Sequence, residues 1–180
     1  MNERIALVTL FNQSGIEKIN SFFQTIEEPL CKIPFGKNVN DRIKVDTLPY
    51  HLTISAWDIE KKDEILKELA PINFPKFSIH VDSIQIMNGK ENSYVLYFNI
   101  EPNNELKLLH ETIYSVLPSE RHNPAHVHFH ITITIEKDYE KIIRIKKELE
   151  KNFTPFNLDI NRLGLFSIYP ANLIKIINSN

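Results

Sequence analysis

The sequence predicts a bilobal α+β protein in which two halves repeat one arrangement of helices and strands. A five-residue pattern, aromatic–His–aliphatic–Thr–Ile, occurs as Tyr50–Ile54 and again, 79 residues later, as Phe129–Ile133. Both copies lie in runs of alternating apolar and polar residues, which is the period of a half-buried strand. The same shift superposes Phe77–Val81 on Phe156–Ile160. We therefore expect two antiparallel sheets related by a pseudo-twofold axis, flanking a central cleft, with helices outside.

The expected elements follow in the same order in each half. A near-continuously apolar strand, 5–11, opens the chain and should be central. Ser14 and Glu17 have the spacing of a capping box, so a helix should run from there to about Cys31. A long loop at 32–48 precedes the motif strand at 50–57, a short helix, and a hairpin at 77–86 and 94–100. The apolar phase of the hairpin flips near Asp82-Ser83, which predicts a bulge.

The second half should contain a helix at 104–117, the motif strand at 127–135, a helix capped by Asp138, and strands at 156–168 and 173–178. We expect one domain over residues 1–180, with lobes at about 12–100 and 101–180 and the opening strand at 4–11.

The composition excludes several function classes. The net charge of −2, from 21 basic and 23 acidic residues, argues against binding of duplex nucleic acid through a basic surface. The single cysteine, Cys31, rules out an internal disulfide and fits a reducing compartment. The apolar run Ile5–Phe11 is too short to span a membrane. We expect a soluble, cytoplasmic and monomeric protein.

Each copy of the pattern pairs a histidine with a threonine two residues later. On a strand such residues share a face, so His51 lies with Thr53 and His130 lies with Thr132. The segment His110–Thr112 has the same spacing, but it falls in an expected helix, where such residues point roughly 200° apart around the axis. We therefore expect His110 in the core and a candidate active site at the two strand copies.

Both motifs, His51-Leu52-Thr53-Ile54 and His130-Ile131-Thr132-Ile133, resemble the His-x-Thr-x motifs of the 2H phosphoesterase superfamily. Its best-known branch is the 2′-5′ RNA ligase-like (LigT-like) cyclic phosphodiesterases. The resemblance extends over essentially the whole chain. It implies a bilobal fold with a water-filled groove, chemistry without a metal or other cofactor, and small nucleotides or RNA ends as substrates, with a 2′,3′-cyclic phosphate or a 2′-5′ linkage.

The chemistry of the residues agrees with this resemblance. Opening a cyclic phosphate needs a base that activates water and an acid that protonates the departing ribose oxygen. A histidine, with a pKa of about 6.5, can do either near neutral pH. We assign His130 as base and His51 as acid, although a pseudo-symmetric site supports the reverse as well. The hydroxyls of Thr53 and Thr132 would bind the phosphate and stabilise its developing charge. RNA ligation, the reverse reaction, would use the same residues.

Other residues are expected to line the site. By alternation, Ser55 should share the face of His51, while His128, Thr134 and Glu136 should share that of His130. Three aromatic residues near strand ends are candidates for stacking on a nucleobase: Tyr50, Trp57 and Tyr169. Arg121 and Arg162 are candidate phosphate-binding residues.

Two alternative functions remain open. His126, His128 and His130 would alternate onto one face of a strand, an arrangement that would instead ligate the metal of a metal-dependent hydrolase. That alternative leaves the His51 copy unexplained, and inhibition by a chelator would support it. The other alternative is a non-catalytic nucleotide-binding module, which would bind its ligand without turnover.

Overall fold

The computed structural model describes residues 4–24, 26, 50–168 and 171–180. The loop expected at 32–48, the expected helix end at Cys31, and Tyr169 lie outside the described residues. In the described part of the chain, no helix is both long and apolar enough to cross a membrane.

The fold is α+β, as expected, and its strands form a seven-stranded antiparallel sheet. The strand order is β2-β1-β6-β3-β4-β5, and β7 pairs with β6 as well. The strands are β1 (Arg4–Phe11), β2 (Thr53–Asp58), β3 (Phe77–Asn88), β4 (Tyr94–Glu101), β5 (His130–Glu136), β6 (Phe156–Ile168) and β7 (Asn172–Asn178). β1 lies between β2 and β6, which agrees with its apolar sequence.

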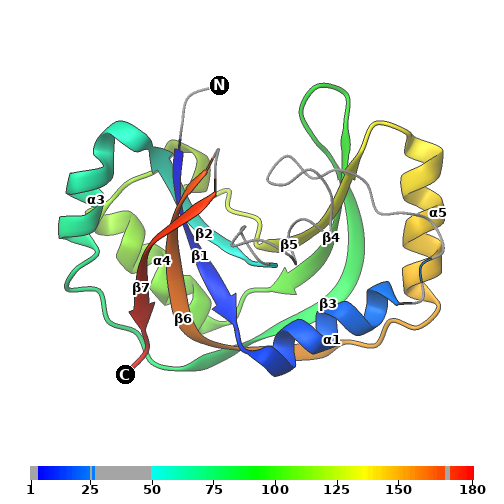
Figure 1. Ribbon diagram of the computed structural model, residues 1–180, viewed down its shortest axis with the longest axis horizontal. Coiled ribbons are helices and arrows are strands. Elements are labelled where there is room, and N and C mark those ends of the chain that lie inside the picture. The colour runs from blue at the N-terminus through cyan, green and yellow to red at the C-terminus, as the bar shows by residue number, and fades with distance from the viewer. Residues whose placement is uncertain (1–3, 25, 27–49, 169–170) are drawn as a thin grey trace.

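The two halves share this one sheet, whereas the sequence had suggested a sheet for each. Residues 156–160 of β6 pair with β3, and residues 160–168 pair with β1. A strand of 13 residues spans about 43 Å, long enough to serve different partners along its two halves. Figure 1 shows β1, β2 and β7 on one side and β4 and β5 on the other, with β6 and β3 running between them.

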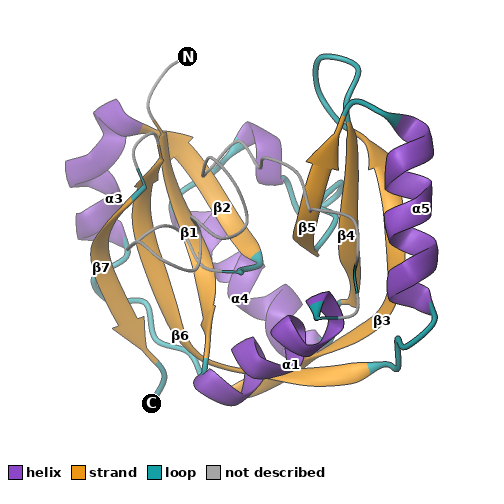
Figure 2. Ribbon diagram, turned by 45° about the vertical axis from the view of Figure 1, so that its right-hand side comes forward, coloured by secondary structure: helices purple, strands orange, loops and turns teal. Residues whose placement is uncertain are grey.

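Four α-helices occur in the described residues: α1 (Gln13–Phe23), α3 (Lys62–Glu68), α4 (Asn104–Val116) and α5 (Tyr139–Glu150). Two short 3-10 helices, η1 (Ile59–Lys61) and η2 (Glu120–His122), follow β2 and α4. α5 packs against β3, β4 and β5, and α4 packs against β2 and β3 (Figure 2). α4 and α5 therefore each lie against one of the two motif strands, β2 and β5.

The helix caps agree with the sequence at α5 but differ at α1. Asp138 caps α5 by accepting a hydrogen bond from the Lys141 N–H at 3.1 Å. α1 is capped by Asn12, which accepts from the Gly15 N–H at 2.8 Å, so the expected capping box at Ser14 is wrong. An asparagine side chain is a strong N-cap, and here it begins the helix one residue before that serine.

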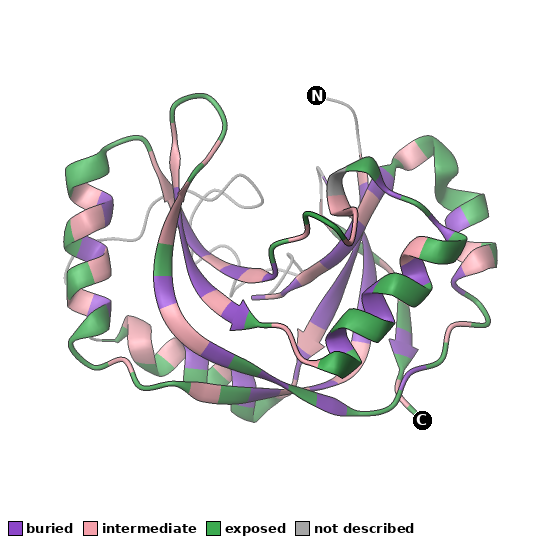
Figure 3. Cartoon of the chain, turned by 180° about the vertical axis from the view of Figure 1, so that it is seen from behind, coloured by how far each residue is buried: buried purple, intermediate pink, exposed green. Residues whose placement is uncertain are grey.

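The core lies between the sheet and the helices, and in Figure 3 buried and exposed residues alternate along the helices. Leu106, Leu109 and Ile113 of α4 are buried, as their helical spacing predicts. His110 is only 2 % exposed, so its expected position in the core is confirmed. The bulge expected in β3 is also present: the pairing with β4 shifts between Val81 and Ser83.

Candidate active site

The two motif strands meet at one point, where Leu52 pairs with Ile131 in an isolated antiparallel bridge. β2 and β5 are the two ends of the strand order, so this bridge brings the ends of the sheet together. Leu52 is also fixed to β1: its N–H donates to Thr9 Oγ1 at 3.0 Å, and its carbonyl accepts from the Thr9 N–H at 2.9 Å. Both bridge residues are completely buried and point into the core.

The register of this bridge brings the two His/Thr pairs together. Antiparallel pairing places the residue before one partner opposite the residue after the other. His51 therefore lies opposite Thr132, and Thr53 lies opposite His130. Because both bridge residues point into the core, all four neighbours project from the other face. All four side chains are half-buried. The tertiary fold thus gathers four polar groups from two distant segments.

A bulge in β2 changes which residues accompany Thr53. Val8 pairs with Thr53 and Leu7 pairs with Ser55, which leaves Ile54 as the extra residue. Paired residues share a face and adjacent residues do not, so Ser55 points away from Thr53. Ser55 is only 2 % exposed. The expectation that Ser55 shares the face of His51 is therefore wrong, because it assumed unbroken alternation.

β5 carries the equivalent bulge at the same position of its motif. Tyr97 pairs with Thr132 and Leu96 pairs with Thr134, so Ile133 is the extra residue. Thr134 is completely buried and lies on the face opposite to that of Thr132. The expectation that Thr134 lines the site with His130 is wrong for the same reason. The two bulges limit each motif's contribution to one histidine and one threonine.

The ring of His130 is held by its own strand. Its Nδ1 lies 2.9 Å from the carbonyl oxygen of His128, and only a protonated Nδ1 can donate to that acceptor. In the neutral imidazole this leaves a lone pair on Nε2. Burial lowers the pKa of His130 below its ordinary value of 6.5, the bond to the carbonyl opposes this, and the His128 side chain lowers the pKa further. A neutral His130 at pH 7 is a competent proton acceptor.

The rings of Tyr97, His128 and His130 contact one another. The ring centroids of His128 and His130 are 5.7 Å apart, with the planes 24° from parallel. Tyr97 meets both edge-to-face, at 5.2 Å from His128 and 5.4 Å from His130. Tyr97 is 7 % exposed, so its ring forms a buried wall against the two imidazoles. The expected position of His128 beside His130 agrees with this contact.

Tyr97 and Asn99 are site residues that the sequence analysis did not name. Tyr97 pairs with Thr132 and Asn99 pairs with His130 on the neighbouring strand. Both therefore lie on the motif face, which we define as the face of the sheet that carries the two His/Thr pairs. Asn99 Nδ2 donates to Asp82 Oδ1 at 2.8 Å, and burial together with the Asp82 carboxylate raises the pKa of Tyr97 above 10.0. Their two-residue spacing on the hairpin strand was the available signal, but it becomes informative only when β4 is known to pair with β5.

Comparison with known proteins identifies the family to which the chain belongs. Residues 26–170 match the family model of the 2′-5′ RNA ligase superfamily. The chain belongs to the 2′-5′ RNA ligase superfamily. No curated protein matches the sequence.

Solved structures share the fold of this superfamily member at low identity. E. coli LigT in its apo form has a TM-score of 0.64 and 13 % identity, with 100 % of this chain and 99 % of LigT covered. LigT complexed with 3′-AMP gives a TM-score of 0.64, 14 % identity and the coverages 100 % and 99 %. Kluyveromyces marxianus Usb1 gives a TM-score of 0.50 and 13 % identity, with 98 % of each chain covered. These comparisons show that the fold is shared over the whole length.

Two of the three aromatic candidates of this family member are buried rather than exposed for stacking on a nucleobase. Tyr50 is buried and stacks on Phe23, with centroids 5.3 Å apart. Trp57 is 6 % exposed, and its indole N–H donates to the Leu117 carbonyl at 3.1 Å. Both rings pack in the hydrophobic core. Tyr169 lies outside the described residues.

Arg162 is the charged candidate that the fold brings to the motif face. It pairs with Leu10 on β1, two residues from Val8, and Val8 in turn pairs with Thr53. Arg162 therefore shares the face of Thr53, with β1 between their strands. It is half-buried, and no carboxylate of the described residues forms an ion pair with it. The side chain of Arg121 lies outside the described part.

The structure does not align the three histidines of the alternative metal site on one strand. His126 lies in a turn, where its N–H donates to the Asn123 carbonyl at 2.9 Å, and β5 begins only at His130. The strand alternation that would align His126 with His128 and His130 is therefore absent. Among the described residues, no group of three or more His, Cys, Asp or Glu side chains is arranged to hold a metal ion.

Proposed function

We propose that this protein is a phosphodiesterase that acts on 2′,3′-cyclic phosphates or 2′-5′-linked nucleotides and RNA ends by two-histidine acid/base catalysis. The observation that carries the proposal is the Leu52–Ile131 bridge, which gathers both His/Thr pairs on one face. The superfamily membership supports the reaction class. The LigT structure with 3′-AMP supports a small nucleotide or a nucleotide end as the ligand.

In the proposed reaction His130 acts as the base. Its Nδ1–H is engaged by the His128 carbonyl, so Nε2 is the nitrogen that accepts a proton from water. The water oxygen then bonds to phosphorus while one ribose P–O bond of the cyclic phosphate breaks. His51 supplies the proton that the departing ribose oxygen needs. The products are a phosphomonoester and a free ribose hydroxyl. In a ligation, the 5′-hydroxyl of a second RNA end would attack the phosphorus in place of water, and the same ribose P–O bond would break as the new phosphodiester forms.

The threonines and the sheet face complete the proposed site. As charge grows on the non-bridging phosphate oxygens, the hydroxyls of Thr53 and Thr132 donate hydrogen bonds to them. The guanidinium of Arg162 faces the same side and supplies positive charge. The substrate lies on the face that carries the two His/Thr pairs, so that both histidines flank one phosphorus.

The test is phosphorus NMR of cytidine 2′,3′-cyclic phosphate incubated with the protein and EDTA. Conversion of the cyclic signal to a monoester by the wild type, but not by His51→Ala, supports the proposal. The chemical shift of the product identifies which ribose oxygen leaves. Turnover that occurs only after a metal is added would contradict the two-histidine mechanism. Binding without turnover would instead indicate a nucleotide-binding module.

A further inference from the structure

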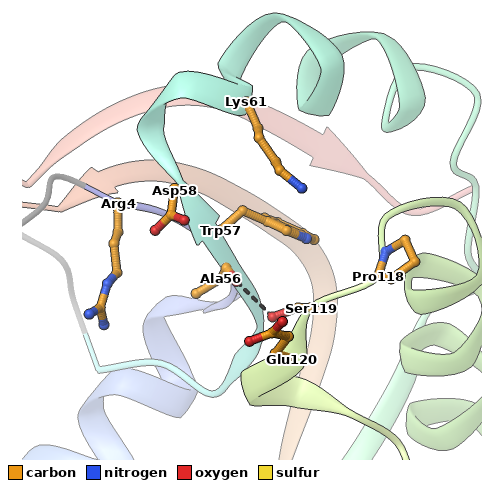
Figure 4. Close-up of a pocket in the computed structure, with 8 residues that line it drawn as sticks. All are labelled: Arg4, Ala56, Trp57, Asp58, Lys61, Pro118, Ser119 and Glu120. Carbon is orange, nitrogen blue, oxygen red and sulfur yellow. Dashed lines mark hydrogen bonds between the residues drawn. The ribbon is translucent and has the colours of Figure 1, made fainter.

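A cavity of about 290 Å³ lies at the far end of β2, away from the two histidines. Its lining residues are Arg4, Ala56, Trp57, Asp58, Lys61, Pro118, Ser119 and Glu120 (Figure 4). The cavity thus forms where the end of the motif strand and the residues after it meet the segment that follows α4. Nothing in the proposed chemistry uses it.

Two hydrogen bonds fix the walls of this cavity. The Trp57 indole N–H donates to the Leu117 carbonyl at 3.1 Å, and the Ser119 hydroxyl donates to the Ala56 carbonyl at 2.8 Å. Both bonds join β2 to the segment that leads into η2. Because the indole N–H and the serine hydroxyl are engaged in these bonds, the charged side chains are the groups that remain to meet a ligand.

Four charged residues line the cavity in equal numbers of each sign: Arg4 and Lys61 are basic, and Asp58 and Glu120 are acidic. Within the described part of the chain, none of the four belongs to an ion pair. In the view of Figure 4 the Lys61 side chain lies above the Trp57 indole and Glu120 lies below it. The cavity therefore presents both cations and hydrogen-bond acceptors.

The register of β1 and β2 relates the cavity to the active site. Val8 pairs with Thr53, Ala6 pairs with Ala56, and Arg4 pairs with Asp58, so the cavity residues Arg4 and Asp58 form the second row beyond that of Thr53. Two residues of a strand span about 7 Å, which puts the last of these rows about 14 Å from Thr53. This is the distance over which the neighbouring units of an oligonucleotide extend.

We propose that this cavity is a second nucleotide subsite, so that the preferred substrate is a short single-stranded oligonucleotide that carries the reacting phosphate at its end. This inference rests on the proposed function. The basic side chains Arg4 and Lys61 bind a phosphate of a neighbouring nucleotide. The carboxylates of Asp58 and Glu120 accept hydrogen bonds from the amino group of a base such as cytosine. The volume of about 290 Å³ lies at the low end of the range for small-ligand sites, which suits a single nucleotide.

The test compares cytidine 2′,3′-cyclic phosphate with a tri-cytidine oligonucleotide that ends in the same cyclic phosphate. We expect kcat/KM of the wild type to be at least about tenfold higher for the trinucleotide. In Lys61→Glu, kcat/KM for the trinucleotide should fall at least about fivefold, through KM, while the mononucleotide stays within about twofold. Lys62→Glu is the matched control, because Lys62 is also exposed but does not line the cavity.

Equal kcat/KM values for the two substrates, or an equal loss for both in Lys61→Glu, would overturn the subsite. A binding measurement separates this failure from a failure of the proposed function. Calorimetry with 3′-phosphorylated tri-cytidine should give a Kd at least about fivefold weaker for Lys61→Glu than for Lys62→Glu. If the wild type hydrolyses neither substrate, the proposed function is wrong, and the binding result still decides whether the cavity holds a nucleotide.

Discussion

Within the described residues, Leu52 and Ile131 form the one backbone bridge between the two motif strands, and both side chains are completely buried. The bridge therefore combines two functions. Its apolar side chains anchor the ends of the sheet in the core, at about 1.5–3 kcal/mol for each buried aliphatic residue. Its register turns the flanking histidines and threonines to the opposite face, so the geometry of the site follows from core packing.

Replacing either motif histidine should abolish most of the activity. We expect His51→Ala and His130→Ala each to lower kcat at least about 100-fold, because each removes a general acid or base. His110→Leu is the matched control, since this histidine has the same His-x-Thr spacing but is buried on α4. Steady-state hydrolysis of a cyclic nucleotide measures the effect. A 100-fold loss in His110→Leu with an unchanged melting temperature would contradict the face assignment.

The hydroxyl residues before and after each bulge should differ in their effect on kcat. We expect Thr53→Val and Thr132→Val to lose roughly 1–3 kcal/mol of transition-state stabilisation, because a hydroxyl donor to the phosphate is removed. Ser55→Ala and Thr134→Val should leave kcat nearly unchanged, because these residues point away from the motif face. Kinetics with thermal unfolding as a control test this. A comparable loss of kcat in both classes would show that the bulges do not set the site.

Tyr97 should position His130 through its ring. Tyr97→Phe keeps both edge-to-face contacts, so we expect kcat to change little. Tyr97→Leu removes contacts worth about 0.5–1.5 kcal/mol each, and we expect kcat to fall by up to about tenfold. The acid limb of the pH profile should also move to higher pH in Tyr97→Leu, because the burial that lowers the pKa of His130 decreases. A large loss in Tyr97→Phe would instead show that the phenol hydroxyl takes part in the reaction.

The pH dependence of activity should report the lowered pKa of His130. A base must be neutral, so kcat/KM should rise with pH through a pKa below 6.5. Because the neighbouring His128 lowers that pKa, His128→Asn should raise it and shift the acid limb to higher pH. His126→Asn is the control, since His126 is also exposed but lies in the preceding turn. A shift to lower pH in His128→Asn would contradict the electrostatic account.

His110 should make the protein sensitive to acid. Burial lowers its pKa below 6.5, against opposing effects of the His122 backbone and Glu111, and its Nε2 has no hydrogen-bond partner in the described part. Below pH 6.5 the unfolded chain therefore binds a proton that the folded protein rejects, so stability is lost as the pH falls from 6.5 through the folded-state pKa. Urea unfolding between pH 5 and 8 should show a smaller loss in His110→Leu than in the wild type.

Some features could be predicted from the sequence because they depend on local pattern. The bulge near Asp82 was visible because the apolar phase flips there, from Val81 to Ile84. The bulge at Ile133 was not visible, because Ile131 to Ile135 alternates with threonine without a break. A bulge is a property of two paired strands, so a single strand reveals it only when its own pattern is interrupted.

The α+β class, most of the strands and helices, and the two His/Thr pairs could be predicted from the residue order alone, because period and repetition are local properties of the chain. Three features required the paired strands: the halves share one sheet, Ser55 and Thr134 point away from the motif face, and Tyr97 and Asn99 lie on it. These outcomes depend on which strand pairs with which, and in what register. Register is set by packing between distant segments, and a shift of one residue reverses the face of every side chain beyond it.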